Sequence, residues 1–513
     1  MNTFKRKALI SAVLAGIGAA GTAEAVYLSP NNTGQVLIYP YYTVQSAAGN
    51  NWNTYISVVN TTSRAKAVKV RFLEGKTSAE VLDFNLFLSP NDVWTGAIIP
   101  ADATATSPGR LVTADVSCTN PPIPATGVDF RNFLFTGGDA LPGAGLDRTR
   151  EGYVEILEMG VLTGTWAAAV THTAAGTPAN CAVVNVAPSS LTPLTIENPQ
   201  GAMAGTGTLI NVNSGLDATY QAQALEGWRN DTFFTDSGFV TPSLASAVPA
   251  ISLVINSGLI DPATGASTLA TAYRTDFGLA AVSGVASGAR AVASVFMHTA
   301  VLNEYVLDTA TQSLTDWVIT QPLKRLFVSN TTAAQPYSNI LTSSGACETI
   351  GFSFFNREER GATASGSDFS PLPPGATANS ICWESSVVSI KNGAAHMPAN
   401  TTSSVLGSVN VTNVTVTTGF QNGWGALTFT GTGATTLGMG PTAAGTSGGV
   451  SLGTNFAGAI PAPFAGVVTF FGLPATGFMV RTFKNGNLTC GTATCQGNYG
   501  GLFTHGFRTV ITP

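Results

Sequence analysis

The sequence predicts an all-β protein, with two or more antiparallel β-sandwich (immunoglobulin-like) domains and long Gly/Thr/Ala-rich loops. The first observation is apolar alternation with a period of two: Val68, Val70 and Phe72 alternate with Lys69 and Arg71. The period recurs in consecutive segments separated by turn residues, which is typical of half-buried antiparallel strands. The second observation is a strand spacing of roughly 10–12 residues, which favours a sandwich.

The third observation is composition. Charged residues make up 10% of the 513 residues, far below the usual quarter. Many Thr and Asn residues with few charges suit an extracellular β-protein whose surfaces form neutral hydrogen bonds. Such surfaces also pack readily against copies of themselves, because few charges repel.

Residues 26–175 are expected to form an N-terminal β-sandwich. Residues 176–250 show little periodicity and are expected to be a loop-rich insertion over one end of that sandwich. The strands of the sandwich are predicted at 35–42, 55–60, 68–73, 82–88, 149–160 and 164–173.

A central β-sandwich region is expected over residues 251–391. C-terminal strands at 465–513 are expected to complete a sandwich. Between them, the Thr/Gly-rich segment 392–464 could be exposed β-structure or loop, since low hydrophobicity with low charge fits both. The central strands are predicted at 250–255, 289–298, 302–307 and 315–330, the last broken at Gln321-Pro322.

Residues 1–25 have the features of a signal peptide. A basic stretch at 5–7 precedes an apolar stretch at 8–20, and the small-x-small pattern AEA at 23–25 follows. The apolar stretch is too short to anchor the chain in a bilayer, so cleavage before Val26 is expected. The predicted location is therefore outside the cytoplasm: extracellular or on the outer cell surface, with the periplasm as the alternative. No transmembrane span is expected after removal of the signal.

The six cysteines fit this compartment, because an even number in an exported chain favours disulfides. Fifteen pairings are open, and order along the chain favours sequential pairs. No C-x-x-C motif and no Cys/His cluster is present, so we expect no metal site and no covalent haem. The expected pairs are Cys118–Cys181, Cys347–Cys382 and Cys490–Cys495.

No catalytic or cofactor-binding constellation is found in the sequence. The G-x-S-x-G match at 445–449 lacks the strand before and the helix after it that a nucleophile elbow needs. Carboxylates such as Glu151 or Glu155 leave a secreted hydrolase as a minor alternative. The formal net charge of −5 gives no basic face for nucleic acid. We therefore expect a protein that is not an enzyme and has no cofactor.

A charged ribbon stands out in a chain so poor in charge. Lys69 and Arg71 are expected on the solvent face of their strand, Arg64 and Lys66 in the preceding turn, and Asp83 could neutralise one of them across the sheet. If the protein assembles, the ribbon is a candidate contact for an acidic patch of a neighbouring copy, such as residues 151–158. The candidate interface residues are Arg64, Lys66, Lys69, Arg71, Glu151, Glu155 and Glu158.

Exposed aromatic residues could form a carbohydrate platform. Core packing is the better expectation for most of them, because the sequence does not assign their faces. The candidates are Tyr41, Tyr42, Trp52, Trp94, Trp228, Trp317 and Trp424.

Several phrases, including TYISVVNTTSRAKAVKVRFLEG, TREGYVEILEMG and GLPATGFMVRTF, resemble exported Gram-negative proteins described as cell-surface or surface-layer-like proteins. The resemblance implies a surface location and adds no site residues. The expected function is that of a secreted non-catalytic structural protein of the bacterial surface, which assembles with itself into a layer, sheath or filament. The alternative is an adhesin or carbohydrate-binding protein with cell-surface glycans as partners.

Overall fold

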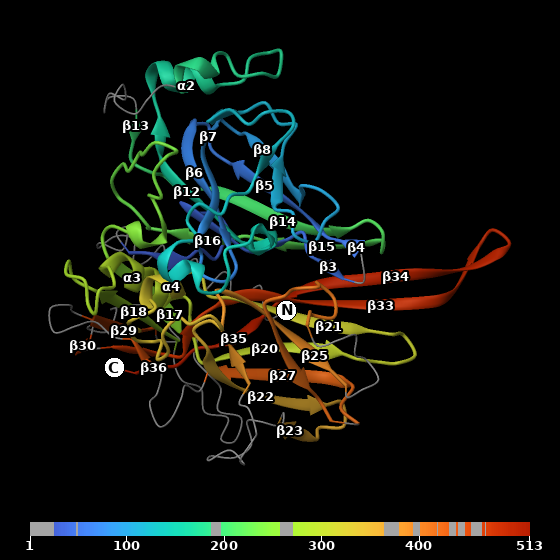
Figure 1. The fold of residues 1–513 in the computed structure, drawn as a ribbon. Coiled ribbons are helices and arrows are strands. Elements are labelled where there is room, and N and C mark those ends of the chain that lie inside the picture. The colour runs from blue at the N-terminus through green and yellow to red at the C-terminus, as the bar shows by residue number, and fades with distance from the viewer. Residues whose placement is uncertain are drawn as a thin grey trace.

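The predicted fold class is confirmed by a computed structural model, in which antiparallel β-sheets are the main secondary structure of the described chain (Figure 1). The predicted signal peptide lies outside the described residues except for Ala25. Within the described part, no helix is both long and apolar enough to span a bilayer. The described residues are 25–47, 50–185, 196–256, 270–363, 379–392, 401–417, 419–429, 438–439, 447–452, 464–466 and 468–512.

Two sheets form an N-terminal sandwich around one hydrophobic core. Sheet 1 has the order β1 (Tyr27–Leu28), β16 (Gln223–Glu226), β2 (Val36–Thr43), β12 (Glu151–Leu162), β6 (Lys66–Glu74), β7 (Glu80–Leu88), β10 (Cys118–Asn120), with β13 (Ile196–Glu197) on β12. Sheet 2 has the order β11 (Val128–Asp129), β9 (Gly109–Val112), β8 (Val93–Pro100), β5 (Asn53–Asn60), β14 (Met203–Asn211), β15 (Leu216–Gln221).

Two sequence predictions for this region were wrong. Strands β14, β15 and β16 lie inside the segment 176–250 that was expected to be a loop-rich insertion, and they complete both sheets of the sandwich. The strand predicted at 164–173 is instead the helix α2 (Gly164–Val170), which buries Trp166. Short 3-10 helices complete the region at η2 (Gly137–Ala140), η3 (Leu146–Arg150), η4 (Cys181–Val183) and η7 (Leu244–Ser246).

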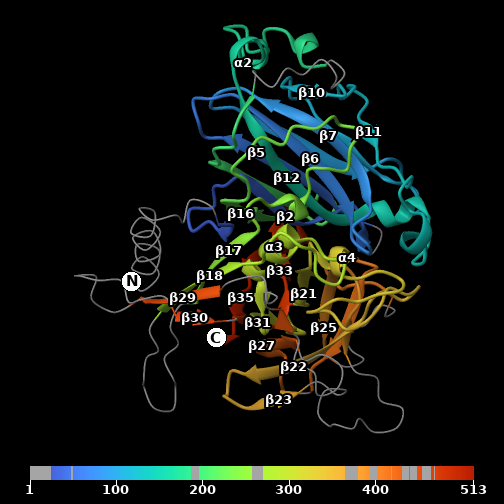
Figure 2. The same ribbon diagram turned by 90° about the vertical axis from the view of Figure 1, so that its left-hand side faces the viewer.

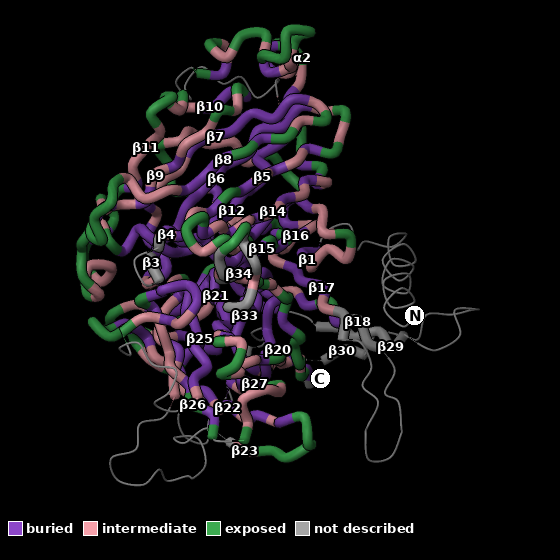
Figure 3. The backbone as a smooth tube through the Cα atoms, turned by 90° about the vertical axis from the view of Figure 1, so that its right-hand side faces the viewer, coloured by how far each residue is buried: buried purple, intermediate pink, exposed green. Residues whose placement is uncertain are grey.

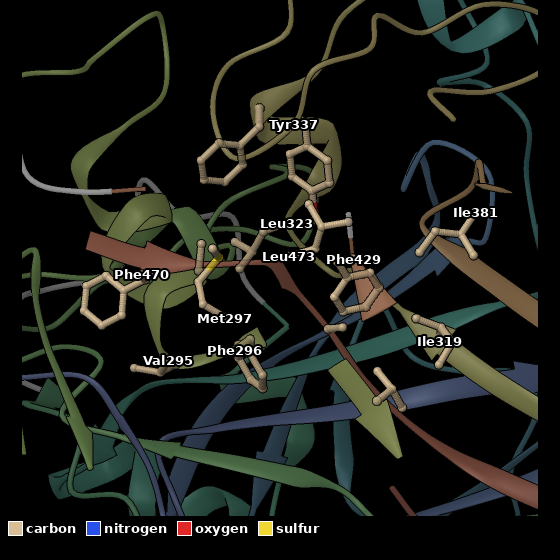
Figure 4. Close-up of a cluster of buried hydrophobic side chains, with 14 of the residues drawn as sticks. Val295, Phe296, Met297, Ile319, Leu323, Tyr337, Ile381, Phe429, Phe470 and Leu473 are labelled. Carbon is tan, nitrogen blue, oxygen red and sulfur yellow. The ribbon is translucent and has the colours of Figure 1, made fainter. Parts of the chain in front are cut away.

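Two further sheets form a second sandwich, whose core includes the cluster shown in Figure 4. The one parallel pair in the described sheets joins β25 to β26. Sheet 3 has the order β23 (Gly361–Thr363), β22 (Glu348–Asn356), β27 (Asn422–Phe429), β20 (Ala300–Val306), β35 (Gly506–Arg508), with β24 (Ser380–Ile381) on β22. Sheet 4 has the order β26 (Val411–Thr415), β25 (Ser385–Lys391), β21 (Leu314–Thr320), β33 (Thr476–Cys490), β34 (Ala493–Thr504).

Smaller sheets and ladders complete the described fold. Sheet 5 has the order β17 (Ile251–Asn256), β18 (Ala270–Asp276), β29 (Ser447–Leu452), β30 (Phe464–Gly466). Short ladders join β28 (Gly438–Met439) to β31 (Thr469–Phe471) and β36 (Ile511–Thr512), β19 (Met297–His298) to β32 (Leu473–Pro474), and β3 (Ser46–Ala47) to β4 (Asn50–Asn51).

Two predicted central strands are helical in part. The run 289–298 forms helix α3 (Ser287–Val295) and then β19, and the run 315–330 forms β21 followed by α4 (Lys324–Phe327). Every residue of α3 is buried, and a run of small apolar residues does not by itself distinguish a buried helix from a buried strand. Segment 392–464, left open by the sequence, contributes β26 and β27 to the second sandwich.

Sheet 4 is buried on both faces and joins the two sandwiches, which lie one above the other in Figure 2. On β21, Trp317 and Ile319 belong to the core shared with sheet 3, whereas Val318 belongs to the core of the N-terminal sandwich. Phe478 of β33 faces that second core as well and stacks on Tyr220 at 4.9 Å between ring centroids. The burial of β21 is visible in Figure 3.

Two predicted disulfides are confirmed. Cys118 is bonded to Cys181, and Cys347 to Cys382. The third predicted pair lies at the tip of the β33–β34 hairpin, where the side chain of Cys490 is outside the described part of the chain. The pair Cys490–Cys495 therefore stays a prediction.

Candidate functional site

The charged ribbon lies inside the protein, so its predicted exposure was wrong. Lys66 is a β6 residue that points inward, and its Nζ lies 2.7 Å from Oε1 of Glu158 with both side chains 0% exposed. Burial raises the pKa of Glu158, although Lys66 opposes the shift. Of the four basic residues, Arg64 alone is exposed, at 39% of its side chain, and it pairs with Glu197.

Lys69 is covered by residues 236–237, which follow β16, the last strand of sheet 1 along the sequence. Lys69 pairs with Asp83, as the sequence suggested, and donates to the backbone carbonyls of Asp236 and Ser237 at 3.1 and 3.2 Å. Burial, helped by the carboxylate of Glu80, raises the pKa of Asp83 to about 6. The hydrogen bonds from Lys69 hold residues 236–237 against sheet 1.

Arg71 bridges two acidic side chains on neighbouring strands. Its Nε lies 2.6 Å from Glu80 and its Nη1 2.8 Å from Glu155. Burial raises the pKa of Glu155 to about 7, against the opposing effect of Arg71. The basic residues Lys66 and Arg71 therefore pair with the acidic residues Glu158 and Glu155 within one chain. These four side chains are not free to bind a neighbouring copy.

Glu151 joins the two sandwiches. Its carboxylate accepts hydrogen bonds from Tyr41 Oη and Ser408 Oγ, both at 2.6 Å, and from the backbone N–H of Val409 at 3.0 Å. Burial raises its pKa. Glu151 and Glu155 are each engaged by partners and line none of the described grooves, so the geometry gives no support to either as a hydrolase carboxylate.

A groove of about 610 Å³ opens at one end of the second sandwich. Strands β20, β27 and β22 form its floor, the β20–β21 turn forms one rim, and β33 contributes Phe483. Its lining residues are Glu304, Tyr305, Val306, Asp308, Thr311, Asn356, Arg357, Asn422, Gly423, Trp424 and Phe483.

An aromatic pair forms the surface of this floor. Trp424 stacks on Phe355 with ring centroids 4.5 Å apart and an interplanar angle of 14°, and it remains 42% exposed. The register places Glu304, Trp424 and Phe355 directly opposite one another across β20, β27 and β22. Directly paired residues project on the same face of a sheet, so the indole is flanked by a carboxylate on one side and a ring on the other.

Two residues that line the same groove, Tyr305 and Asn422, each carry a buried polar atom. The hydroxyl of Tyr305 and Oδ1 of Asn422 are buried and have no hydrogen-bond partner among the described residues. Burial raises the pKa of Tyr305, so its hydroxyl stays neutral and can donate. A buried polar group without a partner costs free energy.

Arg481 links the groove to the hairpin. Its Nη1 lies 3.1 Å from Oε2 of Glu304, and its guanidinium lies over the rings of Phe503 and Phe483 at 4.4 and 5.5 Å from their centroids. The cation is thus neutralised within the chain and holds two aromatic side chains in place.

Of the aromatic candidates from the sequence, the structure buries all except Trp424. The sequence contained a sign of the exposure of Trp424. In 422–429, the apolar residues Leu427 and Phe429 occupy odd-numbered positions and Trp424 an even-numbered one. Period-two alternation places Trp424 opposite the buried face. Phe355 and Phe483, which complete the site, come from distant strands and were missed.

The comparisons with known proteins identify no relative: no family model matches this chain, and no curated protein or solved structure is similar to it.

Proposed function

We propose that this chain is an exported surface protein that binds carbohydrate through the groove around Trp424. The observation that carries the proposal is the exposed indole of Trp424, stacked flat on Phe355 in a groove whose lining also includes the polar residues Glu304, Asp308 and Arg357. Ligand sites combine apolar and aromatic walls with a few polar groups that fix orientation. A sugar ring has both an apolar C–H face and hydroxyls around its edge.

Each side chain then has a definite role. The C–H face of a pyranose packs on Trp424, which supplies a large apolar surface. The carboxylate of Asp308 can accept from a sugar hydroxyl and the guanidinium of Arg357 can donate to a sugar oxygen, since both residues line the groove.

The charges around the groove favour a neutral sugar. Glu304 and Asp308 are acidic, Arg357 is basic, and Arg481 is paired with Glu304. This set has no excess positive charge to attract an acidic sugar, and the whole chain has a formal net charge of −5. Glu304 is 68% exposed in its side chain and can accept a hydrogen bond from a hydroxyl at the rim.

Substitution of Trp424 tests the proposal. We expect Trp424→Ala to abolish binding on an array of neutral glycans, because the stacking platform is removed. The matched control is Tyr55→Ala, an exposed aromatic residue on β5 of the other sandwich (49% exposed), which should bind like the wild type. The proposal fails if the wild type binds no glycan or if Trp424→Ala binds as well as the wild type does.

A structural role in a surface layer, sheath or filament is the second candidate. Its specific support is the β33–β34 hairpin, which projects beyond the body of the molecule in Figure 1, together with a surface of low charge. Electron microscopy of the purified protein should then show sheets or fibres. A monodisperse monomer in light scattering would argue against this role and would leave the carbohydrate proposal untouched.

A further inference from the structure

The aromatic surface of the groove continues onto the projecting hairpin. Strand register places Tyr499 directly opposite Phe483, which lines the groove, and Phe503 opposite Met479. Tyr499 is 52% exposed and Phe503 is 42% exposed. Side chains of directly opposed residues lie about 5 Å apart at their Cβ atoms, so Tyr499 extends the aromatic wall that begins at Phe483.

On β34 itself, only a glycine lies between the two exposed rings on this face of the hairpin. Gly501 separates Tyr499 from Phe503 on the same face of β34, and a Cβ on Gly501 would lie 2.8 Å from the Phe503 ring. The glycine therefore lets that ring lie close to the backbone. The two aromatic residues are four positions apart in the sequence, which is roughly 13 Å along a strand. This distance is longer than a single sugar ring.

We propose that the ligand is an extended, neutral oligosaccharide that runs from Trp424 in the groove along the hairpin face past Phe483 to Tyr499. This inference rests on the proposed function and specifies the class of ligand. Successive sugar rings pack on successive aromatic side chains, so each added ring gains apolar contact without needing a charged partner.

The fixed positions of the rings favour this ligand. Arg481 contacts both Phe503 and Phe483 and is itself held by Glu304. Because these rings are held before binding, ordering them costs the complex little entropy. The guanidinium of Arg481 is paired with Glu304, so at this point of the path it offers no unpaired positive charge to an acidic polymer.

Calorimetric titration against sugars of increasing length tests the inference. The probes are glucose, cellobiose and cellohexaose, the matching N-acetylglucosamine series, and an oligogalacturonate as the acidic comparison. We expect affinity to rise with chain length in a neutral series and to be absent for the oligogalacturonate. Failure of every neutral probe to bind would overturn both the inference and the proposed function.

Two variants separate the inference from the proposed function. Tyr499→Ala should weaken binding of the longest oligomer about tenfold, or about 1.4 kcal/mol, and leave disaccharide binding unchanged. Trp424→Ala should abolish both, and Tyr55→Ala should change neither. If Tyr499→Ala binds the longest oligomer like the wild type while Trp424→Ala binds nothing, the extended path along the hairpin is wrong. The proposal that the groove around Trp424 binds carbohydrate is then kept. If Trp424→Ala has no effect, the proposed function itself fails.

Discussion

At the scale of single residues, the buried pair of Lys66 and Glu158 shows how this chain places the few charges it has. The Glu158 carboxylate accepts from Lys66 Nζ at 2.7 Å and from the backbone N–H groups of Gln200 and Gly201 at 3.1 and 2.7 Å. An unpaired buried charge is far more costly than a paired one. The pair therefore fixes the chain at 200–201 against β6 and β12.

Removing one partner should expose that cost. We expect Glu158→Ala to lower the free energy of unfolding by about 3–5 kcal/mol, because it removes the carboxylate that pairs directly with the buried Lys66 ammonium. Urea denaturation measures the change. The double variant Lys66→Met/Glu158→Leu should recover most of the loss, since it replaces the pair with apolar side chains of similar volume.

The nearby exposed pair supplies the control. Arg64→Ala breaks an ion pair with Glu197 whose side chains are 39% and 53% exposed, and an exposed pair is worth only about 0–1 kcal/mol. If Glu158→Ala lowers the free energy of unfolding no more than Arg64→Ala does, the Glu158 carboxylate does not stabilise the protein by pairing with Lys66.

The same residues show what sequence reasoning can reach. Strand parity alone places Lys66 on the inward face with Val68, and the structure agrees. The prediction that Lys66 lies in the turn avoided this inward position and was wrong. A buried Lys needs a partner. That partner lies 92 residues away in the sequence, and a single sequence carries no local sign of such a contact.

At the scale of elements, strands with strong apolar alternation were predictable and strands shaped by close packing were not. Strand β14 reads MAGTGTLIN and alternates between buried and partly buried positions. Two of its buried positions are Gly205 and Gly207, where a Cβ would lie 2.0 Å from Tyr39 Oη and 2.2 Å from the Tyr220 ring. The apolar bulk on this face comes from tyrosines of other strands, so β14 itself looks like loop.

The candidate groove was unpredictable for a related reason. Its floor comes from three strands that are far apart in the sequence, and its wall comes from the C-terminal hairpin. Trp424 could be assigned to an exposed face by parity, but its neighbours Phe355 and Phe483 become neighbours only through long-range pairing. The fold class depends on local periodicity, whereas the site depends on topology.

At the scale of the whole molecule, sheet 4 makes the two sandwiches one body. Val318 and Phe478 pack into the N-terminal core from one face of the sheet, and Trp317 packs into the other core from the opposite face. Polar contacts cross the same boundary: Thr320 Oγ1 donates to the carbonyl of Pro40, and Tyr153 Oη donates to the carbonyl of Pro322 at 2.9 Å. A sheet shared by two cores cannot keep one of them intact when the other unfolds.

This arrangement predicts a single cooperative unfolding unit, which native-state hydrogen exchange can test. Ile156→Ala on β12 removes a fully buried side chain of the N-terminal core and should cost about 2–5 kcal/mol. The slowest amides of β27, in the far sheet of the second sandwich, should lose the same protection as those of β12, because both exchange through global unfolding. The exposed variant Tyr55→Ala should change neither strand. If Ile156→Ala lowers the protection of β12 and leaves that of β27 intact, the sandwiches open independently, and sheet 4 couples them less tightly than its two buried faces imply.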